Sequence, residues 1–309
     1  MKRSLPIRIL RLAALLLLLA GAAELLLVLS VMVNHRRGDE PAPEPLVRAA
    51  LQAGGMERVE FYSSDGTLLV GDLMGDFVTR PVVVFGHGYR DRRRSGDPLA
   101  YALLEAGYAA LLFDFRGSGA SGGTFTGIGA IEGPDVEAAL RFLEGSRGVR
   151  PGRTAYVGFS MGAAAGLMAA PALSRLAAVV LIAPYARMEE TFEARTLRYA
   201  QSRLRPMFAP ALWVFRQVLG VDSRNVNPYR HAGDLAPAPL LLIGAGGDWR
   251  APQSDLDLIF KAAREPKKLI VLEPADHRIL AGMGPGVQAP ILDFLNERLP
   301  PRSPDQAGR

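Results

Sequence analysis

The stretch TAYVGFSMGAAAG, residues 154–166, sets a single serine, Ser160, between Gly158 and Gly162. The apolar run before the serine predicts a β-strand, and the alanines after it predict a helix that begins at once. A Gly-x-Ser-x-Gly turn between a strand and a helix is typical of a nucleophile elbow, whose strained backbone lifts the serine hydroxyl off the sheet edge. The glycines are required because the two backbones pass too close for side chains. We therefore predict a nucleophilic Ser160; the alternative is a tight turn with an incidental serine.

Strand and helix signals alternate along the rest of the chain. A hairpin is predicted from 56–62 and 67–74, joined by a turn at SSDG. Uniformly apolar strands separated by helices indicate a mostly parallel sheet that is covered on both faces. The predicted fold class is therefore α/β, with one domain at 46–300 and a tail at 301–309. Further strands are expected at 81–88, 109–115, 153–159, 176–184, 239–246 and 267–273, and helices at 98–108, 132–145, 161–173, 252–264 and 287–299.

The composition excludes several classes of site. The chain of 309 residues is 49% hydrophobic and carries a net charge of +5 at pH 7, which is ordinary for a globular protein with a large core. The arginines are spread along the sequence, so we interpret the positive charge as surface character and expect no nucleic-acid partner. The absence of cysteine excludes disulfides, thiolate metal sites and a cysteine nucleophile.

The N-terminus has the form of a membrane segment. An apolar stretch at 12–33 follows a segment at 1–11 that contains four basic residues. At about 22 residues, the stretch is long enough to span a hydrocarbon core of roughly 30 Å. Glu24 interrupts it, but the many Leu and Val side chains outweigh the cost of one acid. We predict a single-pass transmembrane anchor, followed by a linker at 34–45.

Processing and orientation follow from the residues around this stretch. The Ala-Gly-Ala sequence at 20–22 has the small-x-small form of a signal-peptide cleavage site, so a cleaved signal peptide is the alternative to an anchor. Four basic residues precede the stretch, and Arg36, Arg37 and Arg48 follow it. By the positive-inside rule, this small excess favours a domain on the outer side of the membrane, periplasmic or extracellular.

A serine nucleophile needs a general base, and the chain has four histidines. His35 adjoins the apolar stretch, His87 lies in a glycine turn before the elbow, and His231 precedes the strand that starts at residue 239. His277 follows the last predicted strand, at the carboxyl edge of the sheet where loops converge on the serine. We predict that His277 is the base.

The base needs an orienting carboxylate, for which Asp248 is the candidate. Asp248 lies just after the apolar strand at 239–246, separated from it by Gly247. The order Ser160, Asp248, His277 matches the order of nucleophile, acid and base in enzymes with this elbow. Three other carboxylates stay open as candidates: Glu189, Glu190 and Asp255.

An acyl-transfer site also needs N–H donors for the developing oxyanion. The residue after the nucleophile, Met161, supplies one at the start of the predicted helix. The second is expected in the loop GHGYR at 86–90, and we assign it to the N–H of Tyr89. We expect His87 to shape this loop rather than to transfer protons.

A glycine-rich loop after the strand at 109–115 resembles a cofactor motif. The sequence GSGASG at 117–122 matches Gly-x-Gly-x-x-Gly, but a dinucleotide fingerprint requires the helix to open within the motif. Here GTFTGIGAIEGP intervenes before the next predicted helix. We therefore predict no organic cofactor and no metal, and expect Asp114 and Arg116 to hold the loop together.

From about 56 to 299 the sequence resembles the alpha/beta hydrolase superfamily, in particular the serine-aminopeptidase-like and Bem46-like hydrolases, some of which are membrane-anchored. The matching pieces are HGY, FDFRGSGASGG, GFSMG, GAGGDWRAP and DHRIL, in this order. Asp276 departs from the commoner form, which has a small residue before the histidine. The resemblance implies a catalytic triad and an acyl-enzyme, but the superfamily includes esterases, lipases, thioesterases and peptidases.

The stretch at about 185–236 interrupts the alternation of strands and helices. In the resembled superfamily, insertions after this strand overhang the nucleophile. Helical spacing of Phe208, Leu212, Phe215 and Leu219 gives one apolar face. Two interpretations stay open: a lid that selects apolar acyl chains, or a helix that packs on the domain core.

Together these features predict a membrane-anchored serine hydrolase that cleaves an acyl ester or thioester of a small molecule or a lipid. Within enzymes, the alternatives are an amide hydrolase of the serine peptidase or aminopeptidase type, and an acyltransferase. Outside enzymes, the alternative is a catalytically silent, membrane-tethered binding protein.

Overall fold

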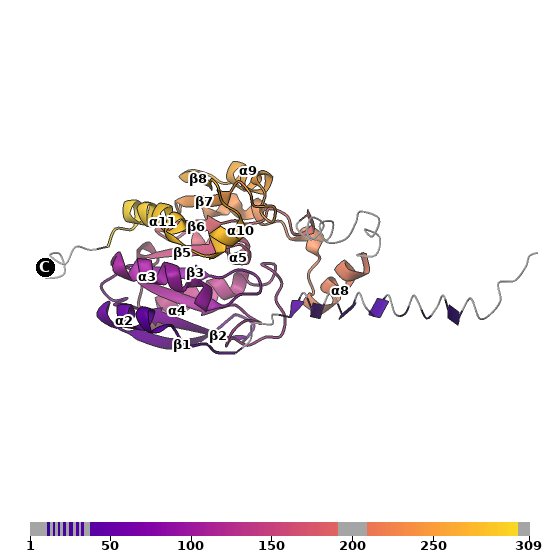
Figure 1. Cartoon of the computed structure of the whole chain (residues 1–309), viewed down its shortest axis with the longest axis horizontal. Coiled ribbons are helices and arrows are strands. Elements are labelled where there is room, and N and C mark those ends of the chain that lie inside the picture. The colour runs from indigo at the N-terminus through magenta and orange to yellow at the C-terminus, as the bar shows by residue number, and fades with distance from the viewer. Residues whose placement is uncertain are drawn as a thin grey trace, which may run out of the picture.

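An eight-stranded sheet forms the centre of the protein in the computed structural model, which describes residues 38–190 and 209–301 and some of residues 11–33 (Figure 1). Across the sheet the strands follow the order β1-β2-β4-β3-β5-β6-β7-β8. Strand β2 is antiparallel to both β1 and β4, and every neighbouring pair from β4 to β8 is parallel. The strands are β1 (Met56–Tyr62), β2 (Leu68–Met74), β3 (Val82–Gly86), β4 (Ala109–Asp114), β5 (Thr154–Phe159), β6 (Ala178–Ile182), β7 (Leu240–Ala245) and β8 (Lys267–Leu272).

Helices cover both faces of the sheet (Figure 1). On one face, α4, α5 and α9 contribute Val136, Leu167 and Ile259 to a large buried cluster. On the other face, α2, α3 and α11 pack against the strands. The helices are α2 (Glu44–Gln52), α3 (Asp97–Glu105), α4 (Gly133–Arg147), α5 (Met161–Met168), α6 (Ala170–Leu173), α8 (Ala209–Leu219), α9 (Gln253–Ala262), α10 (His277–Ala281) and α11 (Pro285–Arg298), with short 3-10 helices at η1 (Arg93–Gly96), η2 (Pro151–Arg153), η4 (Ser223–Asn225) and η5 (Pro228–Leu235).

The central strands are apolar throughout because both of their faces are buried. In β3, Val82 and Val84 join the cluster on one face, whereas Val83 and Phe85 join the cluster on the other. This division follows from the two-residue period of a strand, which points successive side chains to opposite faces. The predicted α/β class, the parallel sheet covered on both faces and the first hairpin are therefore confirmed.

Helix α2 and the helix that follows the elbow differ from the sequence prediction. Helix α2 lies where we expected the linker to pass into the domain; its first turn contains Pro45, and Leu46 and Ala50 are buried. The helix expected at 161–173 is broken at Ala169 into α5 and α6. Proline explains the break, because Pro171 has no N–H to donate to the preceding turn and its ring clashes with that turn.

The predicted transmembrane anchor at 12–33 falls largely outside the described residues. Among the residues that are described, no helix is both long enough and apolar enough to cross a membrane. Asp39 and Glu40, from the predicted linker, are described, and both contact the domain.

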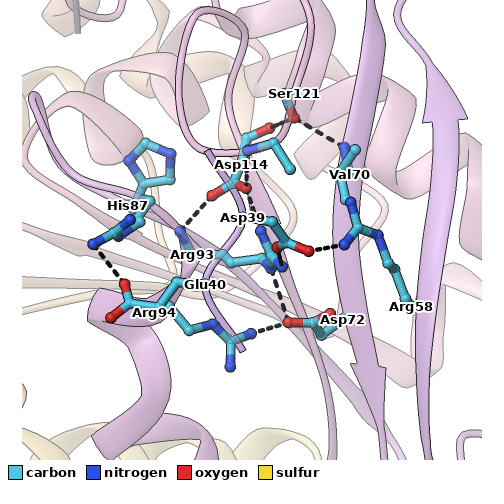
Figure 2. A network of polar contacts seen from close by, with 12 residues as sticks. Asp39, Glu40, Arg58, Val70, Asp72, His87, Arg93, Arg94, Asp114 and Ser121 are labelled. Atoms are coloured by element: carbon cyan, nitrogen blue, oxygen red, sulfur yellow. Dashed lines mark hydrogen bonds and ion pairs between the residues drawn. The ribbon is translucent and has the colours of Figure 1, made fainter. Parts of the chain in front are cut away.

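A buried ion network holds the loop that follows β3 (Figure 2). The Arg93 side chain is only 3% exposed, and its Nε lies 2.8 Å from Oδ2 of Asp72 in β2. Its guanidinium also pairs with Asp114, a fully buried carboxylate at the end of β4. The backbone N–H of Arg93 donates to Oδ1 of Asp114 at 2.7 Å. The C-terminal end of the loop between β3 and η1, at Arg93, is therefore fixed to the neighbouring strands β2 and β4.

Further charges extend this network toward the N-terminus. Arg94 pairs with Asp72, while Asp39 accepts from both Arg93 and Arg58 (Figure 2). Nη2 of Arg92 lies 2.6 Å from Oε2 of Glu40. Hydrogen bonds from arginine hold the pKa of Asp39 below its usual range. These residues from different parts of the chain thus form one connected network of ion pairs.

We expect Arg93→Met to destabilise the protein strongly. Removing one partner of a buried ion pair leaves the other charge uncompensated, at a cost of about 3–5 kcal/mol. Arg58→Met is the matched control, because Arg58 contacts the same Asp39 from a side chain that is 45% exposed. An exposed pair of this kind contributes about 0–1 kcal/mol. The measurement is the free energy of unfolding in urea of the full chain in detergent micelles, and equal small losses for both variants would contradict the assigned role of Arg93.

Candidate active site

Ser160 occupies a strained turn between β5 and α5. Its backbone has φ 51° and ψ −108°, a region that non-glycine residues rarely adopt. Strain of this kind costs on the order of 1–3 kcal/mol and persists only where the surroundings enforce it. Here the N–H of Ser160 donates to the carbonyl of Ile182, at the end of β6, at 2.8 Å. The serine side chain is thereby placed at the carboxyl edge of the sheet.

Close backbone contacts explain both glycines of the elbow. A Cβ on Gly158 would lie 2.7 Å from the carbonyl oxygen of Gly162. A Cβ on Gly162 would lie 2.2 Å from the carbonyl oxygen of Gly86, in β3. Both distances are shorter than a side-chain carbon tolerates, so the predicted requirement for glycine at these positions is confirmed.

Asp248 and His277 meet at the same edge of the sheet. Nδ1 of His277 lies 2.6 Å from Oδ2 of Asp248. The other carboxylate oxygen, Oδ1, accepts the backbone N–H groups of Arg250 at 2.8 Å and Ala251 at 3.2 Å. A carboxylate only accepts hydrogen bonds, so the pair requires the proton on Nδ1 and leaves Nε2 of His277 as an acceptor.

The histidine lies beside the elbow. The rings of Phe159 and His277 are 5.1 Å apart between centroids, and Phe159 is the residue before Ser160. His277 opens α10, which Asp276 caps by accepting the N–H groups of Arg278 at 2.9 Å and Ile279 at 3.0 Å. The aspartate that departs from the commoner sequence form is therefore the cap of the helix that carries the histidine.

Two of the three competing carboxylates, Glu190 and Asp255, have other partners. Oε1 of Glu190 lies 2.6 Å from Nη1 of Arg187 at the surface. Oδ2 of Asp255 accepts the N–H of Ala186 at 3.1 Å, and burial raises the pKa of Asp255 to about 6. Asp248 is thus the predicted carboxylate that the structure brings to His277.

The loop after β3 adjoins the nucleophile and is held by His87. Nδ1 of His87 lies 2.8 Å from the carbonyl oxygen of Gly88, and Nε2 accepts the N–H of Phe115 at 3.0 Å. The ring is completely buried, and this burial lowers its pKa, so a neutral imidazole fits both contacts. A Cβ on Gly88 would lie 3.7 Å from Cβ of Ser160. Tyr89, the predicted oxyanion donor, is the next residue in this loop.

Met161 is the first residue of α5. The first N–H groups of a helix have no partner within the helix, and they carry a partial positive charge. This position suits the predicted stabilisation of an oxyanion beside Ser160. The catalytic role of Ser160, Asp248 and His277, and the oxyanion role of Met161 and Tyr89, stay predictions at this point.

Hydrogen bonds with neighbouring residues of the protein hold the glycine-rich loop at 117–122 in place. Oδ2 of Asp114 accepts the N–H of Ala120 at 2.9 Å. The hydroxyl of Ser121 donates to the carbonyl of Asp114 at 2.6 Å and accepts the N–H of Val70 at 2.9 Å. Arg116 pairs with the buried Asp135, with Nη2 and Oδ1 2.6 Å apart. Across the described part of the chain, no group of His, Asp and Glu side chains has an arrangement that could hold a metal ion.

Sequence reasoning missed one buried residue near the site. Glu132 is completely buried and accepts from the Thr126 hydroxyl at 2.7 Å and from the N–H groups of Gly127 and Gly129 at 2.7 and 2.8 Å. Burial raises the pKa of Glu132. The same Thr126 hydroxyl lies 3.3 Å from Sδ of Met161. Glu132 thus organises a loop beside the elbow, and nothing in the sequence around it distinguishes it from a surface acid.

Solved structures share this fold. The chain superposes on an esterase of Pyrococcus furiosus, Pf2001, with a TM-score of 0.69 at 24% identity, over 87% of this chain and 98% of that one. This likeness shows the alpha/beta hydrolase fold. Residues 78–234 match the family described as serine aminopeptidase, S33, and the chain belongs to this family of hydrolases.

Two relatives show how far the sequence similarity extends. The uncharacterized protein Rv2307c of Mycobacterium tuberculosis is 29% identical over 197 residues, which are 64% of this chain and 63% of the relative. The chain therefore spans less than two thirds of the length of that relative. The thiohydrolase apmlB of Arthrinium phaeospermum is 35% identical over 144 residues, 46% of this chain and 47% of the relative.

We expect Asp248→Asn to leave the protein folded but to slow the labelling of Ser160 by a fluorophosphonate. An amide at this position favours the wrong histidine tautomer, which in other triads lowers turnover by about 10⁴. The control is Glu190→Gln, which removes a carboxylate that pairs with Arg187 at the surface. The labelling rate is followed by mass spectrometry of the intact chain. Wild-type labelling in Asp248→Asn, with loss in Glu190→Gln, would identify a different carboxylate.

Proposed function

We propose that the protein is a membrane-anchored serine hydrolase that cleaves an acyl ester or thioester. The observation that carries this proposal is the 2.6 Å contact between Nδ1 of His277 and Oδ2 of Asp248, at the sheet edge that holds the strained Ser160. A histidine held in this way presents Nε2 as a base, and a serine hydroxyl is a weak nucleophile until a base takes its proton. The three residues thus divide the roles of nucleophile, base and orienting acid.

The reaction would follow the usual course of such a triad. Ser160 Oγ attacks the acyl carbonyl while His277 Nε2 takes its proton, and Asp248 stabilises the resulting imidazolium. The N–H groups of Met161 and Tyr89 stabilise the tetrahedral oxyanion. His277 then gives the proton to the leaving alcohol or thiol, which leaves an acyl-serine. Water, deprotonated by the same histidine, releases the acid and restores the serine.

The choice of an ester or thioester substrate rests on two similar proteins and on the chemistry of the site. Pf2001 is named an esterase, and apmlB is named a thiohydrolase. The family description instead names aminopeptidases, so an amide substrate is the second candidate. The two candidates are separated by measuring rates of hydrolysis on panels of acyl esters, acyl thioesters and aminoacyl amides. Faster hydrolysis of the amides would favour the amide substrate over our choice.

Ser160→Ala should abolish turnover and fluorophosphonate labelling while the protein stays folded. The variant removes only the hydroxyl that the mechanism uses as nucleophile. Labelling is measured on the full chain, and folding is checked by circular dichroism. A catalytically silent binding protein would show no labelling even in the wild type, and labelling retained in Ser160→Ala would place the nucleophile elsewhere.

The anchor is the second part of the proposal, and it rests on the apolar sequence at 12–33 and the basic segment before it. The domain would then lie on the outer side of the membrane. Full-length protein should stay in the membrane fraction after an alkaline carbonate wash. Release by the wash, or a mature chain that starts at Ala23, would show a cleaved signal peptide instead.

A further inference from the structure

The end of the N-terminal apolar stretch lies against the loops that surround the elbow. Leu29, Ser30 and Met32 have helical backbones, and the N–H of Val33 donates to the carbonyl of Leu29 at 2.9 Å. Nη2 of Arg90 donates to the carbonyl of Ser30 at 2.7 Å. This contact joins the stretch to the loop after β3, directly beside Tyr89.

A second loop also binds this end of the stretch. The N–H of Thr126 donates to the carbonyl of Met32 at 2.8 Å. The hydroxyl of the same threonine lies 3.3 Å from Sδ of Met161. The two loops that flank the proposed oxyanion site therefore both hold residues of the N-terminal stretch.

The Met32 side chain is completely buried. It belongs to an apolar cluster, called here the Met32 cluster, that is separate from the two large clusters on the faces of the sheet. Its members come from the N-terminal stretch, the loop after β4, helix α5, the segment after β6, helix α8 and the segment after η4. They are Met32, Ile128, Ala164, Tyr185, Met188, Phe215 and Val226.

The Met32 cluster borders the proposed catalytic residues. Ala164 lies one turn of α5 after the nucleophile, and its N–H donates to the carbonyl of Ser160 at 3.0 Å. One helical turn corresponds to roughly 5.4 Å along the axis. Tyr89, on the oxyanion side, packs against the same cluster. An acyl chain that starts at Ser160 needs only a few carbons to reach this cluster, which is closed to solvent and has to open to admit the chain.

Helix α8 shows which part of the inserted stretch contributes to this surface. Phe215 is only 2% exposed within the Met32 cluster, whereas Trp213 is 62% exposed on the same helix. Phe208 lies outside the described residues. In Figure 1, α8 lies on the same side of the sheet as the described residues of the N-terminal stretch. Phe215 of α8 thus lies in the same cluster as Met32, and Leu219 packs against that cluster.

The residues that follow the N-terminal stretch, at 38–40, also contact the domain. The N–H of Gly38 donates to the carbonyl of Gly119 at 2.8 Å. Asp39 and Glu40 pair with Arg93 and Arg92 in the ion network (Figure 2). Because contacts hold the chain at Ser30 to Met32 and again at Gly38 to Glu40, Met32 has a defined place in the domain.

We propose that Met32 forms part of the wall that the acyl chain of the substrate contacts, so that the N-terminal stretch sets the preferred acyl length. This inference rests on the proposed hydrolysis of acyl esters or thioesters. An unbranched thioether side chain adapts to apolar ligands of varying shape. The segment that would anchor the protein thereby also contributes to specificity, and a fatty-acyl substrate of a lipid surface fits this arrangement.

The test compares acyl esters of one alcohol, from acetyl to dodecanoyl, on the full chain in detergent micelles. Met32→Ala should move the preferred length to longer chains, and Met32→Phe should move it to shorter ones. Each methylene group gained or lost in apolar contact should change kcat/KM by about fourfold. The control is Leu26→Ala, in the same stretch, where the side chain is 67% exposed and the profile should stay that of the wild type.

A purely structural role would give a different result. In that case both Met32 variants lose activity on all esters by the same factor, with a lower melting temperature, and the proposal is wrong. The ratio of labelling rates by long-chain and short-chain fluorophosphonates makes the comparison independent of the folded fraction. It should change in the Met32 variants and not in Leu26→Ala. Failure of the proposed function is visible separately, because the wild type itself would then be neither labelled nor active on any ester.

Discussion

The geometry of the site depends on how closely α5 approaches the strands beneath it. The carbonyl of Gly86 and the backbone of Gly162 leave no room for a side-chain carbon between them. The hydroxyl of Tyr156, in β5, donates to the carbonyl of Gly162 at 2.7 Å and fixes the first turn of the helix against the sheet. A helix this close to its strand has to start from a sharp turn, and the positive φ of Ser160 is the result. Because β5 pairs with both β3 and β6, the stability of the sheet centre offsets this local strain.

Buried polar side chains around the elbow hold the loops on both sides of the nucleophile. His87 holds the loop on one side through both of its ring nitrogens, and Glu132 holds the loop on the other side through four donors. Neither residue is proposed to react. Each satisfies backbone groups that would otherwise be buried without partners, which is costly in a protein interior. The loops on both sides of the nucleophile are therefore held by hydrogen bonds to buried side chains rather than by regular secondary structure.

The sequence predicts the parts of this arrangement that depend on local pattern. Apolar runs of strand length, separated by helices, predict the sheet, and the elbow motif locates Ser160. Asp248 and His277 are found because each follows a parallel strand, and the carboxyl ends of such strands meet at one edge. The contacts of Arg93 with Asp72 and Asp114 escape prediction because they join residues 21 apart on three different elements. The same holds for Met32, whose partners come from distant loops, and for helix α2, whose short amphipathic pattern follows a proline-rich stretch.

The ion network has a consequence for where the folded unit begins. Asp39 and Glu40 precede α2, yet they supply carboxylates to Arg58, Arg92 and Arg93. A fragment that started at residue 46, after the proline-rich stretch, would lack both acids. Arg58 and Arg92 would lose the partners described here, and a patch of unbalanced positive charge would face solvent at this edge. At this edge such a fragment would attract polyanions and anionic surfaces more strongly than the intact chain, whose two acids pair with these arginines.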